Sequence, residues 1–524
     1  MSFMTRIILF FIIFVDILTT EMKHLLPIVA ILAIIPLSCS KEEASSEYPA
    51  GDSEIPYVYP AKNGDMIPDF SHVGYHYGEE EPPVLPVTKV LVAPVGDATE
   101  YIQKAIDESA GGAVLLKSGT YNVSGTIYLN KSGVVLRGDG EGKTIITGTG
   151  KTQRSLIVVG GSSGRELDWN SSTDVAEMYV PVGRYYLDVI DASRFSKGDD
   201  VVIYRPGTDE WIHDLQMDQI PMASDGGTKQ WKASDYNLCY ERKVMKVEGN
   251  RIWFDNPTVM ALDSRYGSGK VMKYSYSGRV SECGVENMTL YSTTNGQPED
   301  EAHCWTAVHM KNVEHSWVRN ITSKQFGYCC VDIAGGSKNI TVDGCTSLDP
   351  VSIITGSRRY AFHISGGQLC LVKNCLCDYD RHQYVTGARV CGPNVFIDSK
   401  STHSHSDAGP HHRWATGVLY DNIVTDGNLD VQDRGNLGSG HGWTGANFVL
   451  WNCTAKAIAC QNPWVAGQNW CIGCKAKKIS GTKYKDRPDG LWASKDKPVT
   501  PASLYKAQKS LPSHINVWEE LGRI

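Results

Sequence analysis

The chain has 524 residues, of which 41% are hydrophobic, and it carries a formal net charge of -7. The hydrophobic share is close to the globular average and argues against a disordered or polytopic membrane protein. The negative charge argues against a general nucleic-acid binder, which would usually be basic. With 51 glycines, 25 tyrosines and 13 tryptophans, the composition suits a turn-rich β protein with aromatic surfaces. We therefore expect an ordered protein that binds no nucleic acid.

The first 39 residues are a targeting segment rather than part of the fold. They contain two apolar runs, each too short to span a bilayer comfortably. The second run follows Met22, an alternative start codon, and ends at Cys39. It resembles a bacterial lipoprotein signal, and the Ser-Lys-Glu-Glu at 40–43 resembles the surface-export tags of Bacteroidetes lipoproteins. The resemblance implies export, lipidation at Cys39 and an outer-membrane location; cleavage by an ordinary signal peptidase is the alternative.

Residues 40–85 are rich in Pro, Glu, Tyr and Gly and are expected to form a tether. The first ordered element is a predicted helix over 100–107, for which Asp97 to Thr99 provide an N-cap. Its Ile102, Ala105 and Ile106 share one apolar face. Glycines end the helix, and five short β-rich runs follow, at 113–116, 120–123, 126–129, 134–136 and 144–147.

This opening stretch, residues 86–162, resembles the start of the pectate-lyase-like superfamily. Its members begin with a helix of the form D-x-T-x-x-I-Q-x-A-I, followed by G-G-x-V-x-L-x-x-G-x-Y and G-V-x-L-R-G-x-G. Here these patterns lie at 97–106, 111–121 and 133–140. The resemblance implies an all-β protein, a right-handed single-stranded parallel β-helix whose end is plugged by the N-terminal capping helix. The superfamily contains lyases, hydrolases, esterases and epimerases, so the substrate stays open.

Residues 163–275 interrupt this pattern with runs typical of antiparallel strands, and we expect an inserted β subdomain. From 276 to 480 a short motif recurs, apolar-x-(Asn/Gly/Asp)-(small or apolar), with gaps of 33, 24, 30, 24, 24, 30 and 21 residues. A period in this range indicates a solenoid. Coils of 24 residues with six-residue extensions fit a parallel β-helix. The third motif residues are Asn287, Asn320, Gly344, Asn374, Asp398, Asn422, Asn452 and Gly473.

The motif also predicts what lies inside the coils. We expect its asparagines to hydrogen-bond to one another through the turns. The next residue is small and soft in five coils, which predicts interior packing; disulfides are the alternative in an exported protein. These residues are Cys345, Cys375, Ser399, Cys453 and Cys474. In the tail, 481–524, a short helix near 501–508 is expected to cap the open end of the core.

Equal offsets in stacked coils place residues about 4.8 Å apart. Counting fifteen residues from three motif positions gives Arg359, Arg389 and Arg413, so we expect one arginine column. Like charges at this spacing are unfavourable unless an anion or carboxylates lie between them. Guanidinium groups also suit bidentate binding of carboxylate or sulfate. The column predicts an anionic ligand, with pairing to nearby aspartates as the alternative; Arg381 and Arg434 are further substrate-binding candidates.

Histidines concentrate in the same region: ten of the fifteen lie between His303 and His441. Histidine is the side chain best placed to move protons near neutral pH. Glycines around His441 let the backbone approach a ligand closely. Trp414, Trp443 and Trp464 are candidates for stacking on sugars, and a wholly structural cluster is the alternative. The candidate catalytic residues are His382, His411, His412, Arg413 and His441.

Acidic residues offer other chemistries in this region. Asp380, Asp407, Asp430 and Asp433 are the candidate acid and base of a glycoside hydrolase. His403, His405 and Asp407 alternate along one strand and are candidates for a transition metal. Calcium needs an oxygen cage, to which Asp426, Asp430 and Asp433 can contribute. No cofactor is certain, and calcium stays possible.

The leading hypothesis is a polysaccharide lyase that cleaves an acidic, uronate-containing glycan by β-elimination. The arginines or calcium would neutralise the uronate carboxylate, and His382, His411 or His412 would take the adjacent proton. A glycoside hydrolase is the first alternative; an epimerase or other carbohydrate enzyme and a non-catalytic glycan-binding β-helix also stay open. We expect a monomer that binds a polysaccharide and contacts the membrane only through its lipid anchor.

Overall fold

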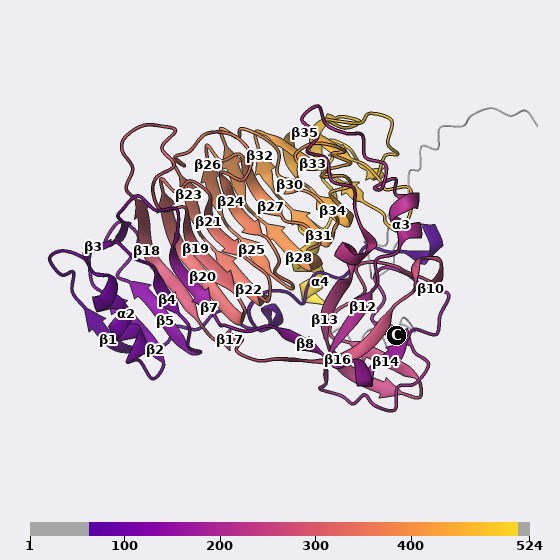
Figure 1. The fold of residues 1–524 in the computed structure, drawn as a ribbon, viewed down its shortest axis with the longest axis horizontal. Coiled ribbons are helices and arrows are strands. Elements are labelled where there is room, and N and C mark those ends of the chain that lie inside the picture. Colours follow the sequence, from indigo (N-terminus) through magenta and orange to yellow (C-terminus); the bar gives the residue numbers. More distant parts are fainter. Residues whose placement is uncertain (1–61, 512–524) are drawn as a thin grey trace, which may run out of the picture. The chain divides into compact units, whose positions relative to one another are not determined.

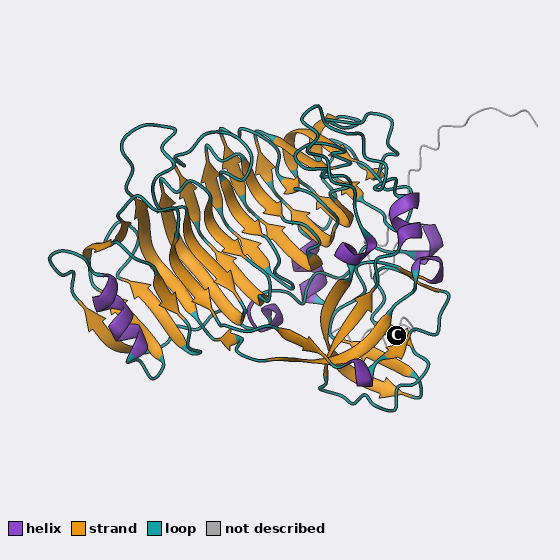
Figure 2. Ribbon diagram, viewed as in Figure 1, coloured by secondary structure: helices purple, strands orange, loops and turns teal. Residues whose placement is uncertain are grey.

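The computed structural model describes residues 62–511. Its dominant feature is a parallel β-helix, in which strands from successive coils stack into long sheets (Figure 1). Strands far outnumber helices in the described chain (Figure 2). The predicted all-β, right-handed parallel β-helix is confirmed. Across residues 62–511 no helix has the length and apolar character needed to cross a membrane. The predicted signal segment, its Cys39 and residues 40–61 of the tether lie outside the described residues.

The β-helix opens with the predicted helix, α2 (Thr99–Asp107). Ile102 and Ile106 are fully buried and join the core that the first strands enclose, because they lie on the same helical face. The helix therefore closes the apolar end of the coil stack. The strands around it are β1 (Val87–Leu91), β2 (Gly112–Leu116), β3 (Gly119–Val123), β4 (Ile127–Leu129), β5 (Val134–Gly138), β6 (Thr144–Gly148) and β7 (Ser155–Gly160).

Each later coil contributes strands to three faces, named here A, B and C. Faces A and B belong to one continuous sheet, since the long strands β18 (Gly284–Ser292) and β20 (Val313–Lys324) run through both. The short strand β17 (Val280–Ser281) pairs with β20. Face A continues with β22 (Lys338–Asp343), β25 (Leu371–Lys373), β28 (Cys391–Ile397), β31 (Ala415–Asp421), β34 (Gly445–Trp451), β36 (Trp470–Ile472) and β38 (Leu491–Ala493). Face B continues with β23 (Thr346–Leu348), β26 (Leu376–Asp378), β29 (Lys400–Thr402), β32 (Val424–Thr425), β33 (Asn428–Val431), β35 (Thr454–Cys460) and β37 (Lys475–Lys478).

Face C is a separate seven-stranded parallel sheet that closes each coil. It starts with β4 and β7 of the N-terminal coils. Its strands are short, and the loops that precede and follow them vary in length from coil to coil. The later strands are β19 (Thr306–Lys311), β21 (Cys329–Ile333), β24 (Tyr360–Ile364), β27 (His382–Thr386) and β30 (Gly409–Pro410).

The repeated motif marks the corner between faces A and B. All eight third residues of the motif have a left-handed backbone, with φ between 48° and 67°. Asparagine and glycine adopt this conformation most easily. Asn320 Nδ2 donates to Asn287 Oδ1 at 2.9 Å, and Asn422 Nδ2 donates to Asp398 Oδ1 at 3.2 Å. The predicted ladder of side-chain hydrogen bonds is confirmed at these two steps, whereas Asn374 Nδ2 donates to Asp343 Oδ1 and Asn452 Nδ2 donates to the backbone oxygen of Val499.

Asn320→Ala is expected to lower the free energy of unfolding by about 1–2 kcal/mol, because alanine strains the left-handed corner and loses the bond to Asn287. Asn320→Gly is the matched control, since glycine keeps the backbone conformation and loses only the hydrogen bond. Urea unfolding of both variants measures the difference. Equal destabilisation by alanine and glycine would contradict the role assigned to the backbone.

The cysteines pack in the interior of the coils. All fourteen cysteines of the described residues are free thiols. Cys345, Cys375, Cys453 and Cys474 are at most 1% exposed and belong to the main apolar core. Cys375 N donates to Ser399 Oγ at 3.0 Å, which keeps the serine in the same ladder. Packing rather than disulfide pairing therefore explains these residues.

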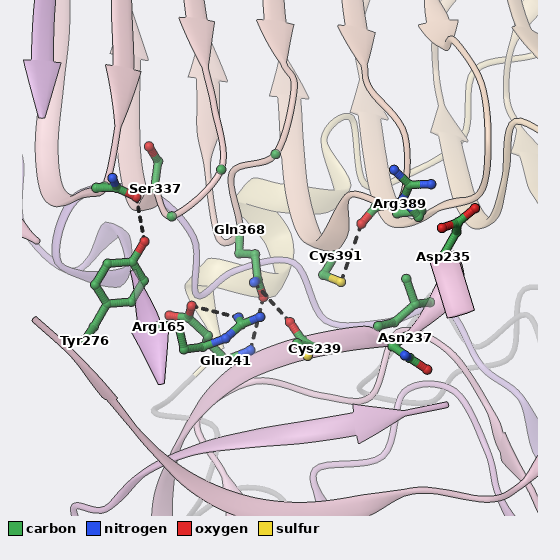
Figure 3. A pocket seen from close by; sticks show the side chains of 15 residues that line it. Arg165, Asp235, Asn237, Cys239, Glu241, Tyr276, Ser337, Gln368, Arg389 and Cys391 are labelled. Atoms are coloured by element: carbon green, nitrogen blue, oxygen red, sulfur yellow. Dashed lines mark hydrogen bonds and ion pairs between the residues drawn. The ribbon is translucent and has the colours of Figure 1, made fainter. Parts of the chain in front are cut away.

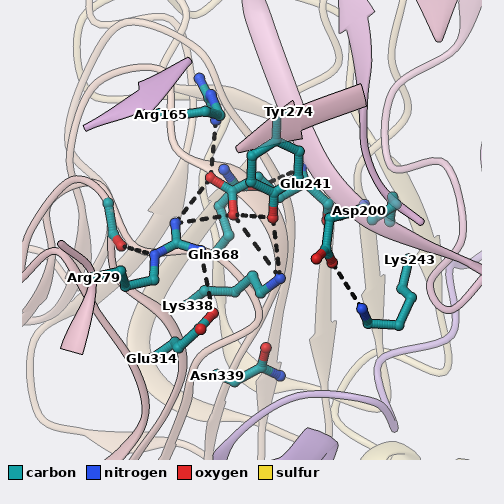
Figure 4. A network of polar contacts seen from close by, with 12 residues as sticks. Arg165, Asp200, Glu241, Lys243, Tyr274, Arg279, Glu314, Lys338, Asn339 and Gln368 are labelled. Carbon is teal, nitrogen blue, oxygen red and sulfur yellow. Dashed lines mark hydrogen bonds and ion pairs between the residues drawn. The ribbon is translucent and has the colours of Figure 1, made fainter. Parts of the chain in front are cut away.

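An antiparallel β subdomain lies between β7 and β17. Its central strand β12 (Asp200–Arg205) pairs with both β13 (Leu238–Glu248) and β16 (Lys270–Tyr276). Figure 4 shows how it attaches to the β-helix: Glu241 of β13 accepts from Arg279, which precedes β17, and lies 4.0 Å from Lys338 of β22. The remaining elements are β8 (Arg165–Leu167), β9 (Thr173–Asp174), β10 (Tyr179–Val180), β11 (Tyr186–Asp188), α3 (Asp209–Asp214), β14 (Arg251–Phe254) and β15 (Leu262–Asp263).

The C-terminal helix forms where it was predicted but has a different place. α4 (Leu504–Ser510) packs its Leu504 and Tyr505 against face A residues such as Leu419 and Val449. Its Gln508 accepts from Phe70 N at 3.0 Å. The prediction that this helix caps the open end of the core is therefore wrong. It covers the outer side of face A together with the segment around Phe70, because that side carries apolar residues of its own.

Candidate functional site

Face C carries polar side chains at one register position of neighbouring strands. His309 of β19 pairs with Asp332 of β21, which pairs with His363 of β24. Asp332 Oδ2 lies 2.9 Å from His309 Nδ1, and Asp332 Oδ1 lies 3.3 Å from His363 Nδ1. Burial opposes the charge on Asp332, but its bonds to His309 and His363 hold its pKa well below the usual range. An ionised carboxylate therefore lies between two imidazoles.

Tyr360, at the start of β24, connects to residues from two later coils. Its Oη lies 3.0 Å from His411 Nε2, and His411 Nδ1 lies 3.0 Å from Arg434 Nη1. A guanidinium group only donates, so His411 Nδ1 must accept and the ring proton must be on Nε2. His411 therefore donates to the phenol oxygen of Tyr360. This leaves the phenol proton of Tyr360 available for transfer.

His382 of β27 lies between these groups, with its ring centroid 4.9 Å from that of Tyr360 and 4.5 Å from that of His411. Its Nδ1 lies 2.7 Å from the backbone oxygen of Asp407. A carbonyl only accepts, so His382 Nδ1 carries the proton and Nε2 carries a lone pair. That Nε2 is buried and has no hydrogen-bond partner within the described residues.

The outer part of the cluster is partly exposed and comes from the loops after β30. The ring centroids of His412 and His441 are 5.1 Å apart, and each lies about 5 Å from that of His411. Native proteins leave few buried polar atoms without a partner, and such atoms call for an explanation. Six of them gather here, which indicates a place that a ligand or water completes: His363 Nε2, His382 Nε2, His412 Nδ1, His441 Nδ1, Arg381 Nη1 and Arg434 Nε.

The electrostatics of the cluster keep its imidazoles neutral. Burial, helped by neighbouring positive groups, lowers the pKa of His412 and of His441 to about 3. Burial likewise lowers the pKa of His382 to about 4 and that of His411 well below its usual value. A neutral imidazole beside arginines can accept a proton without first being deprotonated, and it leaves the arginines free to bind an anion.

Stability is expected to fall as the pH falls from about 6.5 toward about 4, because the unfolded chain takes up protons that the folded histidines refuse. The folded pKa of His382 is depressed, so its contribution is fully present above its unfolded value and lost on acidification. His382→Gln should reduce the pH slope of the unfolding free energy by up to about 1.4 kcal/mol per pH unit. Urea unfolding at pH 7, 6 and 5 measures this slope; parallel slopes for variant and wild type would contradict it.

The four candidate carboxylates have separate surroundings. Asp407 is partly exposed, and Arg434 and His382 hold its pKa below the usual value against the effect of burial. Burial, followed by the charge of Asp407, raises the pKa of Asp430 to about 7. Burial raises the pKa of Asp380 to about 8. Asp433 is buried and its Oδ2 accepts from Arg487 at 2.9 Å. Only Asp407 contacts the histidine cluster directly.

The predicted arginine column is wrong in one of its three members. Arg389 and Arg413 occupy the same corner in adjacent coils, where Arg389 N donates to Arg413 O at 2.8 Å. Arg359 instead precedes its face C strand and is 6% exposed. Its guanidinium donates to Ser352 and so holds the loop before β24. Arg359 is therefore a structural residue rather than a substrate-binding one.

The prediction that Trp414 and Trp443 stack on sugars is also wrong. Trp414 and Trp443 are fully buried and belong to the core of the inserted subdomain. The Trp414 ring lies 5.0 Å from that of Trp211 and its Nε1 lies 3.3 Å from Met260 Sδ. Neither indole can stack on a sugar. Trp464 is 37% exposed and rests edge-on against Trp443.

The candidate metal ligands are not brought together. Within residues 62–511 no group of three or more His, Cys, Asp or Glu side chains has the arrangement of a metal site. His403 pairs with Asp378, whereas Asp407 faces Arg434. Asp426 accepts from the backbone of His403 and Ser404, and Asp430 accepts from Ala459 N. The described residues therefore provide neither the transition-metal set nor the calcium cage that was considered.

Sequence reasoning missed Tyr328, Tyr360, His309, Asp332 and His363. Four of them lie on the face C strands β19, β21 and β24, and Tyr328 immediately precedes β21. The loops before these strands differ in length, so equal offsets from the motif do not align them with His382. The available signal is the apolar-polar-apolar pattern around His309, Asp332 and His363, because successive side chains of a strand point to opposite faces of the sheet. Tyr328 Oη lies 2.8 Å from His363 Nδ1, which ties this earlier coil to the cluster.

Comparison with known proteins bears on the fold. Residues 94–347 match the family model described as rhamnogalacturonase A/epimerase, pectate lyase-like. No curated protein matches the sequence. Among solved structures, a polygalacturonase from Erwinia carotovora ssp. carotovora is 11% identical, covers 79% of this chain and 96% of its own, and has a TM-score of 0.40. An alginate lyase from Paenibacillus sp. str. FPU-7 is 8% identical, with coverages of 78% and 98% and a TM-score of 0.32.

The tailspike Gp54 of Acinetobacter baumannii bacteriophage AP22, solved with a capsular saccharide, is 14% identical with a TM-score of 0.41. The match covers 78% of this chain and 64% of the tailspike, so the chain spans less than two thirds of that protein. Likenesses at this level identify no substrate. The chain is a right-handed parallel β-helix whose residues 94–347 are similar to the pectate-lyase-like family described by that model.

Proposed function

We propose that the protein is a polysaccharide lyase that cleaves an acidic, uronate-containing glycan by β-elimination at the histidine cluster. The observation that supports this proposal most directly is the gathering of six unpartnered buried nitrogens on imidazoles and arginines. Unpartnered guanidinium donors suit a carboxylate. Neutral imidazoles suit abstraction of the proton next to that carboxylate.

In the proposed reaction the uronate carboxylate lies against Arg381, the partly exposed guanidinium with a free Nη1. His412, neutral and partly exposed, takes the proton from the carbon next to the carboxyl group. The electron pair of that C–H bond forms a carbon–carbon double bond, and the glycosidic oxygen leaves with its bonding pair. Tyr360, whose oxygen already accepts from His411, donates its phenol proton to the leaving oxygen.

Substrate binding also adjusts the base. A carboxylate beside His412 favours the protonated form of the imidazole, so the pKa of His412 rises from about 3 toward neutrality. His382 and His411 act as positioning residues, since their bonds to Asp407, Arg434 and Tyr360 fix their tautomers. Arg413 donates to Ser439 at 2.7 Å and so holds the loop that carries His441.

A glycoside hydrolase is the second candidate, favoured by one observation. Asp407 and Asp430 have pKa values pushed in opposite directions, a pattern typical of an acid and base pair. However, Asp430 is 1% exposed and its oxygens accept from Asn428, Gln432 and Ala459. A carboxyl group so occupied is poorly placed to protonate a glycosidic oxygen, so the lyase is the better supported proposal.

Incubation with a panel of uronate-containing glycans tests the proposal. Ultraviolet absorbance reports unsaturated ends, and a reducing-sugar assay reports every cleavage. Both signals should rise on one glycan. Reducing ends without absorbance would replace the lyase with the hydrolase, and silence on the whole panel would favour a non-catalytic glycan binder.

The setting proposed for this activity is the outer membrane, with the chain exported and anchored by a lipid at Cys39. Cleavage of an extracellular polysaccharide is consistent with such a location. Metabolic labelling with a fatty acid tests the anchor, because Cys39→Ala should lose the label. Label retained by that variant would rule out Cys39 as the lipidated residue.

A further inference from the structure

A cavity of about 480 Å³ lies between the β-helix and the inserted subdomain. Such a volume is within the range of about 300–1,000 Å³ typical of small-ligand sites. One wall consists of the turns that follow face C strands, with Gly335, Gly366 and Arg389. The other wall belongs to the inserted subdomain, with Asp235 and Glu241 (Figure 3). The cavity thus joins residues that are far apart in the sequence.

Charges of both signs line this cavity, Arg165 and Arg389 against Asp235 and Glu241, and further cations lie beside it. Glu241 is 2% exposed and receives three cations: Arg165 Nη1 at 3.1 Å, Arg279 Nη2 at 3.0 Å and Lys338 Nζ at 4.0 Å. Arg279 also pairs with Glu314, so three cations face two carboxylates in this network. One positive charge is left without a matching carboxylate there. An anion entering the cavity meets a favourable field.

Arg389 adds a second guanidinium at the cavity. It is exposed, and its guanidinium lies 5.5 Å from the centre of the Tyr236 ring. Its backbone N bonds to Arg413, whose side chain reaches the loop of His441. Arg389, which lines the cavity, and Arg413, which contacts the loop of His441, therefore lie next to each other in adjacent coils. Asp235 is the opposing charge, an exposed carboxylate on the other wall.

The turn wall lets a ligand come close to the backbone. A Cβ built on Gly335 would meet no atom within 4 Å, so the position faces open space and its backbone is accessible. Gly366 packs directly on that turn, since a Cβ there would lie 2.7 Å from Gly335 N. Glycines permit such close approach of a sugar ring. The same feature makes Gly335 a site at which a larger side chain would fill the cavity without backbone strain.

We propose that this cavity is a second glycan subsite, which binds the carboxylate of a uronate residue on the same chain that enters the histidine cluster. The proposal rests on the proposed function for the identity of the glycan. The carboxylate lies between Arg389 and Arg165, and the ring lies against the glycine turn. The inserted subdomain thereby takes part in substrate binding and favours long acidic chains over short ones.

Binding to the full chain carrying His412→Gln tests this subsite without cleavage. The probes are hexasaccharides of galacturonate, of alginate and of hyaluronan, together with the methyl-esterified galacturonate hexamer, measured by calorimetry. One acidic hexamer is expected to bind, and Arg389→Gln should weaken it by about 10- to 100-fold, the effect of a lost charged hydrogen bond. Asp235→Asn should strengthen it by up to about fivefold. The methyl ester should bind at least tenfold more weakly than the free acid, because it loses the same charged hydrogen bond as the Arg389→Gln variant.

Gly335→Leu is the second test and involves no charge. In the wild-type cavity a hexasaccharide should bind more tightly than a disaccharide of the same sugar, and Gly335→Leu should abolish this difference in affinity. The subsite is overturned if the His412→Gln chain binds the hexasaccharide with the same affinity alone and with Arg389→Gln, Asp235→Asn or Gly335→Leu added. It is also overturned if no hexasaccharide binds. Cleavage by the wild type then decides the proposed function separately. If the wild type forms unsaturated ends but the variants bind with unchanged affinity, the lyase proposal stands and the subsite proposal is rejected. If the affinities change as predicted but no unsaturated ends form, the subsite proposal stands and the lyase proposal is rejected.

Discussion

His412→Gln is expected to lower turnover of the acidic glycan by about 100- to 10,000-fold, the contribution of a positioned general base. The reason is local. His412 has an imidazole that is partly exposed, neutral and without a hydrogen-bond partner at Nδ1 in the described chain. Glutamine keeps the approximate size and polarity but cannot take a proton. Ultraviolet absorbance at saturating glycan measures the rate, so that weakened binding does not mask the effect.

His405→Gln is the matched control. His405 belongs to the same stretch of sequence but is exposed, and its ring lies 6.2 Å from that of Tyr379 rather than in the cluster. It should retain wild-type turnover and unfolding free energy. A normal rate in His412→Gln, or an equal loss in His405→Gln, would contradict the assignment of the base. His441→Gln would then be the next variant to measure.

Much of the fold could be predicted from the sequence because its signals are local. The left-handed corner at Asn320 and its counterparts requires asparagine or glycine in every coil, so the period is visible in the residues themselves. The helix α2 also has its apolar face and its N-terminal polar residues in one short segment. These features depend on neighbours along the chain, not on distant contacts.

The site could be predicted only in part, because loop length changes the offsets. In the coil that starts at Gly344, the loop over 349–358 comes before face C, so that β24 begins sixteen residues after the motif. In the next coil, β27 begins eight residues after Asn374. An offset of fifteen therefore reaches Arg359 before its strand and Arg389 after its strand. Equal offsets were a sound guide only between coils of equal length.

The buried tryptophans illustrate a second limit. Trp414 lies close to the histidines in the sequence and was therefore expected to be exposed. In the structure it is covered by Trp211 of the inserted subdomain, which lies about two hundred residues earlier in the chain. No periodicity reports a contact between an insertion and a later coil. A separate contact between the inserted subdomain and the β-helix forms the cavity beside Arg389, which the sequence did not indicate either.

Glu241→Gln is expected to lower the free energy of unfolding by about 3–5 kcal/mol, the cost of breaking a buried ion pair. Glu241 is 2% exposed and lies on β13, whereas Arg279 and Lys338 approach it from the β-helix side (Figure 4). Burial opposes its charge, but Arg279, Lys338 and Arg165 hold its pKa below the usual value. Glutamine would leave Lys338 and Arg165 without this counter-charge, and Arg279 with Glu314 alone.

The control and the pH dependence separate this network from a general effect of charge removal. Glu248→Gln, at the exposed end of the same strand, should change the unfolding free energy by less than about 0.5 kcal/mol. Because the folded pKa of Glu241 is depressed, its stabilisation is present above the unfolded pKa near 4.5 and is lost as the pH falls below it. The difference between wild type and Glu241→Gln should therefore narrow on acidification through pH 4. A difference that stays constant from pH 7 to pH 3.5 would show that packing, rather than the charge of Glu241, attaches the inserted subdomain.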